Sequence, residues 1–135
     1  MAPIDCHRFA FVTVASLDQV WAALTDSEHS RHYLLGLDVV SDWMPGGSVE
    51  LRGPDGISIP GQVLSVQRNQ TLAFAIEQGV GPCRFITWDL RQCSEGTVVR
   101  LTVDEVDGDS EDEAEGTWLP VLSALQSQLD RLLSG

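Results

Sequence analysis

Residues 83–105, CRFITWDLRQCSEGTVVRLTVDE, carry apolar side chains at every second position on either side of a short polar stretch. This alternation predicts two β-strands that each bury one face. If residues 93–96 form the loop between them, the strands make a hairpin in which Trp88 lies opposite Leu101. The hairpin then presents one continuous apolar surface, which predicts a sheet packed against a second layer.

The same register also pairs the charged residues of the hairpin. Asp89 lies opposite Arg100 on the polar face, where opposite charges across a strand pair are favourable. Arg84 lies opposite Glu105 at one end of the apolar face. One register therefore pairs apolar residues with each other on one face and opposite charges on the other. A loop at 78–82 would place the preceding strand beside this hairpin and extend its apolar surface.

The segments outside the hairpin add further strands and helices. We expect strands at 5–14, 37–43, 47–52, 59–67, 71–77, 83–92 and 96–105. Ser16 fits the first position of a capping box that opens a short helix, and a second short helix is expected over 27–35. From Trp118 onward the apolar residues recur with helical spacing. This predicts a long C-terminal helix that begins near Ser110, with a kink or a later start at Pro120.

The composition limits the class of protein. A chain of 135 residues with 43% hydrophobic residues makes one folded domain, which we expect to span 1–135. The net charge of −12 repels nucleic-acid phosphates and anionic membranes, so we expect neither as a partner. No apolar run approaches the roughly 20 residues that span a bilayer, and the N-terminus lacks a signal-peptide pattern, so we expect a cytoplasmic protein. The cysteines, Cys6, Cys83 and Cys93, are expected to be free, partly buried thiols.

Several short motifs occur in a fixed order along the chain. They are Val20-Trp21-Ala22-Ala23-Leu24-Thr25-Asp26, Pro45-Gly46-Gly47, Gly61-Gln62-Val63-Leu64-Ser65-Val66, Gly96-Thr97-Val98-Val99-Arg100-Leu101-Thr102, and Gly116-Thr117-Trp118 with Leu122 and Leu125. With the order strand, two short helices, six strands and long helix, the chain resembles the SRPBCC superfamily, the helix-grip fold of START and birch-pollen-allergen proteins. Within it, the chain is most similar to proteins like the C-terminal domain of the activator of the ninety-kilodalton heat-shock chaperone's ATPase. The resemblance implies an α+β fold, in which a curved antiparallel sheet of about seven strands wraps around a long C-terminal helix.

The resemblance also implies a cavity between the sheet and that helix. Members of the family bind hydrophobic small molecules there, so we expect such a ligand and no cofactor. The residues expected to line the cavity are Phe9, Phe11, Tyr33, Trp43, Phe74, Ile76, Arg84, Ile86, Trp88, Leu101, Glu105, Trp118, Leu122 and Leu125. Two alternatives stay open. One is a protein-interaction domain without a ligand, which contacts a chaperone in a stress response or forms a homodimer; the other is an enzyme like a polyketide cyclase.

Few residues suggest chemistry. His29 and His32 lie three apart, but nothing nearby fixes the further ligands of a zinc site, so we expect no metal. The acidic run 104–115 is not a calcium loop, because the first and last ligand positions fall on Val103 and Ala114. No serine or cysteine lies in a nucleophile motif, and the sequence favours a binding protein over an enzyme.

Arg84 and Glu105 form the polar feature of most functional interest. As a solvated ion pair they would contribute under about 1 kcal/mol to stability. Partly desolvated at the cavity, Arg84 could instead hold a carboxylate or carbonyl group of a ligand. His7, Tyr33 and Trp43 are lesser candidates for the cavity rim, with ordinary packing as the alternative.

Overall fold

The computed structural model describes residues 4–26, 38–53, 56, 58–77, 83–106 and 111–134. Its elements are β1 (Ile4–Thr13), α1 (Leu17–Thr25), β2 (Asp38–Ser41), β3 (Ser48–Arg52), β4 (Ser58–Gln67), β5 (Thr71–Glu77), β6 (Cys83–Cys93), β7 (Gly96–Val106) and α3 (Glu111–Ser134). The strands that the sequence predicts are all confirmed, with small shifts at their ends. The helix expected over 27–35 lies outside the described residues.

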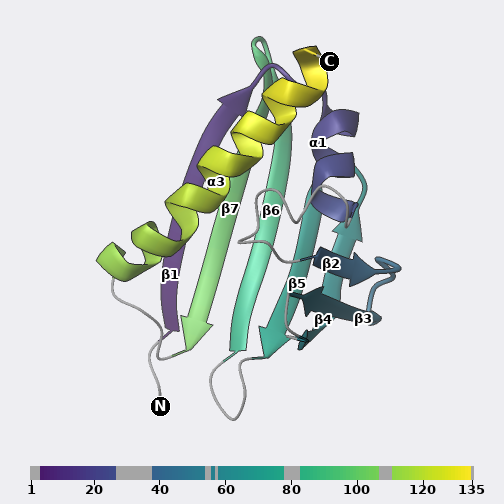
Figure 1. The fold of residues 1–135 in the computed structure, drawn as a ribbon, viewed down its shortest axis with the longest axis vertical. Helices are drawn as coiled ribbons and strands as arrows, with labels where there is room; N and C mark the ends of the chain where they lie inside the picture. The colour runs from purple at the N-terminus through teal and green to yellow at the C-terminus, as the bar shows by residue number, and fades with distance from the viewer. Residues whose placement is uncertain are drawn as a thin grey trace.

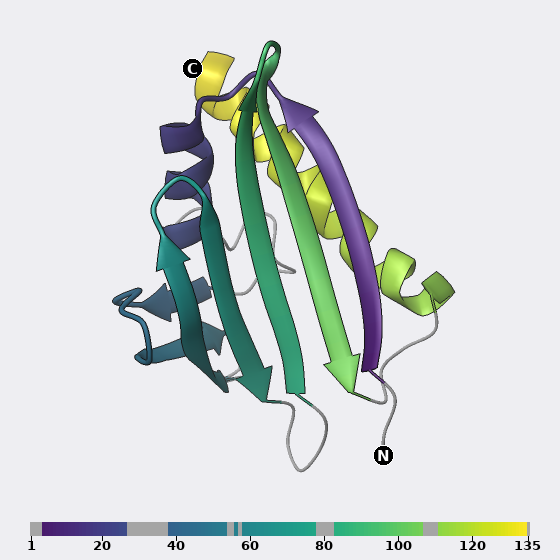
Figure 2. The ribbon, with the colours of Figure 1, turned by 180° about the vertical axis from the view of Figure 1, so that it is seen from behind.

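The strands form one seven-stranded sheet in the order β1-β7-β6-β5-β4-β3-β2, and each neighbouring pair is antiparallel. In Figure 1, α3 crosses the sheet diagonally and α1 lies on the same side of it. Figure 2 views the sheet from behind, where neither helix comes between the viewer and the strands. We call the side that carries the helices the inner face and the opposite side the outer face. The predicted α+β helix-grip fold is confirmed.

The hairpin of β6 and β7 has the register that the sequence predicts, with Trp88 opposite Leu101. Cys93 and Gly96 also pair, so the predicted four-residue loop tightens to a two-residue turn without any change of register. Gly96 has a φ of +138°, and a Cβ at this position would collide with the carbonyl oxygen of Thr13. Glycine is therefore required where the turn passes under the end of β1.

The strand β5 extends the apolar surface of the hairpin as predicted. Phe74 lies opposite Ile86, and Ile76 lies opposite Arg84. On its other side Arg84 lies opposite Glu105 of β7. The charged positions therefore stand at the end of an apolar series, as the alternation of the sequence indicated.

One side of α3 completes the core with the inner face of the sheet. Among the described side chains of this helix, the buried ones are Trp118, Val121, Leu122, Leu125, Gln128 and Leu129. Their spacing of three and four residues places them along one stripe, which faces the sheet. Phe85 of β6, by contrast, points to the outer face and is exposed. The two faces of the sheet therefore have the alternation expected of an antiparallel sheet covered on one side.

The connection from β1 to α1 is fixed by side chains that bond to the backbone. The capping box predicted at Ser16 is confirmed, because Ser16 Oγ accepts from the Gln19 amide (3.2 Å) and Gln19 Oε1 accepts from the Ser16 amide (2.8 Å). Just before it, the buried Thr97 donates its hydroxyl proton to the Ala15 carbonyl (2.8 Å). Thr13 Oγ1 accepts from the Ala15 amide (3.2 Å). The start of α1 is thereby tied to the ends of β1 and β7.

The long helix α3 begins at Glu111, next to the predicted start, and runs through Pro120. Proline removes an N–H from the helix and crowds the residue four positions earlier. That residue is Gly116, and both it and Pro120 are exposed. Water can therefore reach the Gly116 carbonyl group, which has no N–H partner at Pro120. Because the helix already begins at Glu111, the alternative of a start at Pro120 is wrong.

One side chain of the outer face departs from the expectations. Cys6 is exposed and not partly buried, because it points outward from β1, whereas Cys93 is half-buried. Asp89 lies opposite Arg100 as predicted, and its carboxylate accepts a hydrogen bond from the Thr71 hydroxyl of β5 (3.0 Å).

Among the described residues, no helix is both long and apolar enough to cross a membrane.

Candidate functional site

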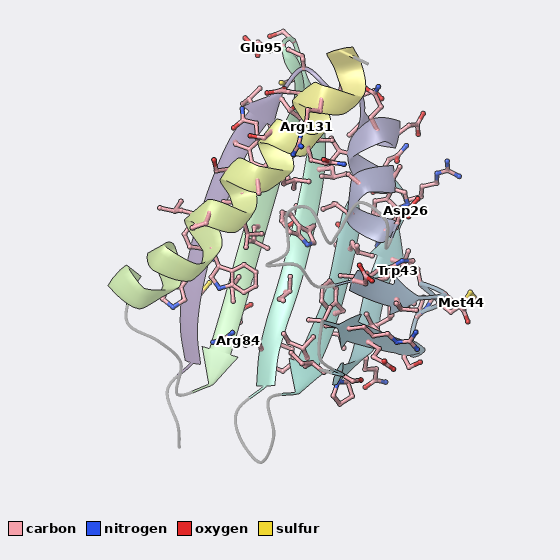
Figure 3. All side chains as sticks on the ribbon, viewed as in Figure 1. Asp26, Trp43, Met44, Arg84, Glu95 and Arg131 are labelled. Atoms are coloured by element: carbon pink, nitrogen blue, oxygen red, sulfur yellow. The ribbon has the colours of Figure 1, made fainter. Side chains whose placement is uncertain are left out.

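The registers of β1, β7, β6 and β5 arrange the inner-face side chains in rows across the sheet. One row runs Phe9, Leu101, Trp88 and Leu72, and the row beside it runs His7, Val103, Ile86 and Phe74. The next row contains the positions of Asp5, Glu105, Arg84 and Ile76. The inner face is therefore apolar over most of its area and becomes polar toward one end. In Figure 3, Arg84 lies toward the end of the sheet opposite the Glu95 turn.

Most of the residues predicted to line a cavity come together between the sheet and α3. Those that are buried in the common core are Phe74, Ile76, Ile86, Trp88, Leu101, Trp118, Leu122 and Leu125. Phe9, Phe11 and Trp43 pack against this core but stay partly exposed. Arg84 is half-buried at the end of the same face. Tyr33 and the side chain of Glu105 lie outside the described part of the chain.

Trp43 is held over the inner face by the loop that follows β2. Its backbone has a φ of +54°, and its amide donates to Ser41 Oγ (3.0 Å). The indole Nε1–H donates to the carbonyl of Thr25 at the end of α1 (2.9 Å). The ring meets Phe74 edge to face, with centroids 5.8 Å apart and planes at 60°. In Figure 3, Trp43 lies near the last turn of α1, so it lies at the margin of the apolar rows.

His7 is the buried polar residue of these rows. It lies on β1 opposite the fully buried Val103 and is only 9% exposed. Its Nε2 atom is buried, and within the described structure it has no hydrogen-bond partner. Leaving a buried polar atom unpaired costs roughly 1–3 kcal/mol, so such atoms are uncommon in folded proteins. Arg84 in the neighbouring row is different, because other groups of the chain already engage it.

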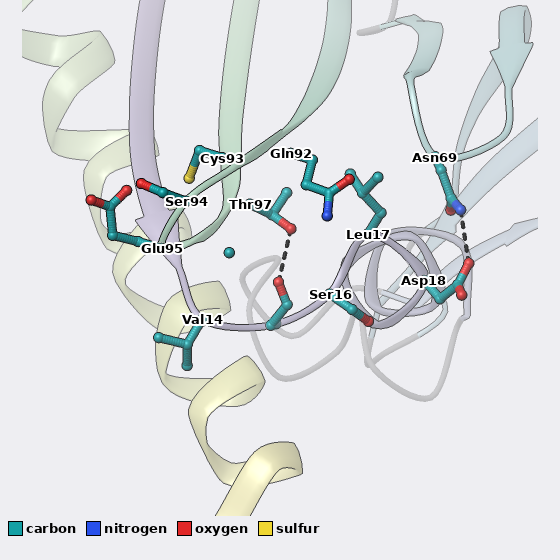
Figure 4. Close-up of a pocket in the computed structure, with 12 residues that line it drawn as sticks. Val14, Ser16, Leu17, Asp18, Asn69, Gln92, Cys93, Ser94, Glu95 and Thr97 are labelled. Carbon is teal, nitrogen blue, oxygen red and sulfur yellow. Dashed lines mark hydrogen bonds between the residues drawn. The ribbon is translucent and has the colours of Figure 1, made fainter.

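A hollow lies at the end of the sheet away from Arg84, beside the start of α1 (Figure 3). Its volume is about 540 Å³, and it is lined by Val14, Ala15, Ser16, Leu17, Asp18, Asn69, Gln92, Cys93, Ser94, Glu95, Gly96 and Thr97. Figure 4 shows two of the bonds that cross it, from the Thr97 hydroxyl to the Ala15 carbonyl and from Asn69 Nδ2 to Asp18 Oδ1 (2.7 Å). Several of its polar groups thus bond to one another and serve the fold. It is wide open and less suited to an apolar ligand.

The outer face carries two smaller hollows, of about 380 and 260 Å³, and Arg100 lines both. Among the described residues, no group of three or more His, Cys, Asp or Glu side chains could hold a metal ion. The pKa of the Cys6 thiol is raised on this face, first by its hydrogen bond to Asp104 and then by burial. The pKa of the exposed Glu50 on β3 is lowered by its hydrogen bond and ion pair with Arg52. Both shifts concern groups away from the apolar rows.

Sequence reasoning undervalued two polar residues. Gln128 is buried on α3, and its position three residues after Leu125 would have predicted this from helical spacing alone. His7 was ranked as a lesser rim candidate, although its position between the apolar Phe9 and the strand end put it on the inner face. The lack of a partner for its Nε2 among the described residues could not be predicted, because it depends on how distant segments pack together.

The sheet, its single long covering helix and the apolar rows between them define a helix-grip protein of the SRPBCC class. A model of one family within this class, described as activator of Hsp90 ATPase homolog 1-like protein, matches residues 14–130. The chain therefore belongs to this family. No curated protein matches the sequence.

Several solved structures share the fold. MLL2253 from Mesorhizobium loti superposes with a TM-score of 0.82 at 18% identity, covering 94% of this chain and 98% of that one. SA2116 from Staphylococcus aureus gives 0.82 at 11% identity, with coverage of 99% and 98%. DynU16, described as a protein in the dynemicin biosynthetic locus, gives 0.75 at 27% identity. The match covers 95% of this chain but only 48% of DynU16.

Proposed function

We propose that this protein binds a hydrophobic small molecule between the inner face of the sheet and α3. The observation that carries the proposal is the set of inner-face aromatic side chains that remain partly exposed. Phe9 and Phe11 stand on the β1 side of the apolar rows, and Trp43 stands on the other side. Apolar side chains left partly open on a covered face offer surface that a ligand can remove from water.

The affinity expected of such a site is moderate. A ligand that buries about 300 Å² of apolar surface gains roughly 7 kcal/mol at ~25 cal/mol per Å². That free energy corresponds to a dissociation constant on the order of 10 μM before the ordering costs of association are subtracted. Binding of this strength supports carriage or sensing of a small molecule.

The likeness to DynU16 supports the proposal by analogy, because DynU16 is described as a protein of the dynemicin biosynthetic locus. The same likeness keeps the cyclase-like alternative open. In that case Arg84, with Glu105 or His7, would supply the acid–base groups, and turnover would depend on pH. A ligand released unchanged after incubation would favour the binding protein over the enzyme.

A protein-interaction domain is the second candidate, and the outer face favours it. Neither of the described helices covers this face (Figure 2). Val12, Leu64 and Phe85 are exposed there. Apolar side chains on an uncovered sheet can mark a contact surface for a chaperone or a second copy of the chain. The family name is compatible with this candidate.

Native mass spectrometry of the gently purified protein tests both candidates. A reproducible adduct with the mass of a small molecule, released on denaturation, would support ligand binding. A ligand-free dimer would instead favour the interaction domain and count against our proposal.

A titration with the apolar dye ANS then locates the site with a matched pair of variants on β1. Phe9→Ala, on the inner face, should weaken binding several-fold. Val12→Ala, on the outer face, should leave the affinity unchanged. Weaker binding in Val12→Ala alone would place the dye on the outer face and contradict the proposal.

A further inference from the structure

His7 lies on the inner face, in the region where we propose that the ligand binds. We propose that His7 Nε2 hydrogen-bonds the ligand, and that the ligand is an apolar molecule carrying a neutral oxygen such as a phenol or a ketone. This inference rests on the proposed ligand binding, because a ligand must first enter the space between the sheet and α3. It adds the class of ligand and the residue that selects it.

The alternation along β1 directs His7 toward α3. Its neighbours in the chain, Cys6 and Arg8, are exposed on the outer face, whereas His7 is 9% exposed. Across the sheet, His7 lies opposite Val103, which has no exposed area. Ile86 follows in the same row and is also buried. Within its row, the imidazole therefore lies beside the buried apolar side chains of Val103 and Ile86.

The Nε2 atom of His7 has no hydrogen-bond partner among the described residues, and this leads us to assign it one from the ligand. The atom is buried, and in the described part of the protein no group bonds to it. The great majority of buried polar side-chain atoms in folded proteins do have a hydrogen-bond partner, from the protein or from an ordered water. A ligand oxygen beside an apolar skeleton would satisfy the imidazole and fill the apolar rows at once.

The net charge of the protein favours a neutral oxygen over a carboxylate. Arg84, which lies opposite Glu105, is already engaged within the chain. The protein as a whole carries a net charge of −12. A ligand carboxylate would be repelled by this negative field, whereas a neutral phenol or ketone would not.

Three probes that share one skeleton test the inference: naphthalene, 2-naphthol and 2-naphthoate. Their dissociation constants are measured by NMR titration of the wild-type protein and of His7→Phe. In the wild type we expect 2-naphthol to bind about five- to tenfold more tightly than naphthalene, the effect of one net hydrogen bond. We expect 2-naphthoate to bind no more tightly than 2-naphthol. In His7→Phe the preference for 2-naphthol should fall below about twofold, with naphthalene binding retained.

A control variant and a second measurement guard against misfolding of His7→Phe. Arg8→Gln changes the next residue of β1, which points to the outer face, and should leave the preference unchanged. In the wild type, the ¹⁵N resonance of His7 Nε2 should move on addition of 2-naphthol and move less with naphthalene. This measurement needs no substitution in the core.

The outcomes separate this inference from the proposed function. If neither naphthalene nor 2-naphthol binds, the proposed ligand binding fails and the role of His7 fails with it. If both bind equally to the wild type, or if the preference persists in His7→Phe, ligand binding stands and the role of His7 is refuted. Tightest binding of 2-naphthoate would refute the neutral oxygen. If a water molecule is the partner of His7 Nε2, naphthalene and 2-naphthol should bind the wild type equally, and the role of His7 is refuted.

Discussion

Replacing Leu125 with alanine tests how α3 is held against the sheet. Leu125 lies on the buried stripe of α3 and has no exposed area. Leu119 lies on the same helix and is 49% exposed, so Leu119→Ala is a matched control with the same chemical change. Any proposal that places a ligand beneath α3 depends on this difference between the two sides of the helix.

The expected loss can be worked from the buried atoms. Leucine to alanine removes three side-chain carbons, worth about 2.4 kcal/mol at ~0.8 kcal/mol for each. A cavity that collapses only in part adds to this, so we expect Leu125→Ala to lower the free energy of unfolding by about 3 kcal/mol. Leu119→Ala should change it by less than about 0.5 kcal/mol, because the residue is half in water and alanine is a good helix former.

Urea denaturation followed by tryptophan fluorescence measures both variants. With a slope of about 1.5 kcal/mol per M, the midpoint of Leu125→Ala should fall by roughly 2 M. The slopes should match that of the wild type if the compactness of both states is unchanged. Equal midpoints for the two variants, or a larger fall for Leu119→Ala, would refute the orientation of α3 and with it the inner-face site.

Two further predictions concern the outer face and the turn of the sheet. Asp104 raises the pKa of Cys6, so less of this thiol is in the reactive thiolate form at pH 8. A protein with Cys6 as its sole cysteine should therefore react with iodoacetamide at pH 8 more slowly than a small free thiol, and Asp104→Asn should speed the reaction. Equal rates with and without Asp104→Asn would contradict the role of Asp104. Gly96→Ala should lower the free energy of unfolding by at least about 2 kcal/mol, because its Cβ would collide with the carbonyl of Thr13. Gly116 is exposed in α3 with open space around it, so Gly116→Ala should instead raise the free energy of unfolding by up to about 1 kcal/mol. If urea denaturation shows that both glycine variants are stabilised, or that both are destabilised, this explanation is contradicted.

The sheet was predictable because two independent patterns agree on one register. Along β6 and β7 the apolar residues alternate, and the charged pair Asp89 and Arg100 falls on the opposite face only in that register. A shift by one residue would have turned Trp88 and Leu101 toward water. Local patterns of this kind are sufficient for strands that are neighbours in the sequence.

The site was predictable only in part, because it depends on contacts between distant segments. The sequence selected Trp43 as a rim candidate but gave no sign of its left-handed backbone or its bond to Thr25, which join a loop to a helix end. The burial of His7 likewise involves a distant segment, since its neighbour in the sheet is Val103 of β7. Hydrophobic patterning says which side chains are inside, but not which polar atoms are left without partners there.

The pairing of β1 with β7 has a consequence for how the protein forms during synthesis. Ile4 pairs with Val106 and Thr13 with Thr97, so the first strand made finds its partner only after some 80 further residues have been added. At roughly 5–20 residues per second, β1 waits for about 4–16 s with its edge unpaired. Contacts so distant in sequence also slow the search for the native state. A ribosome-bound chain that ends before β7 should therefore stay sensitive to protease, and the domain should become resistant only late in translation.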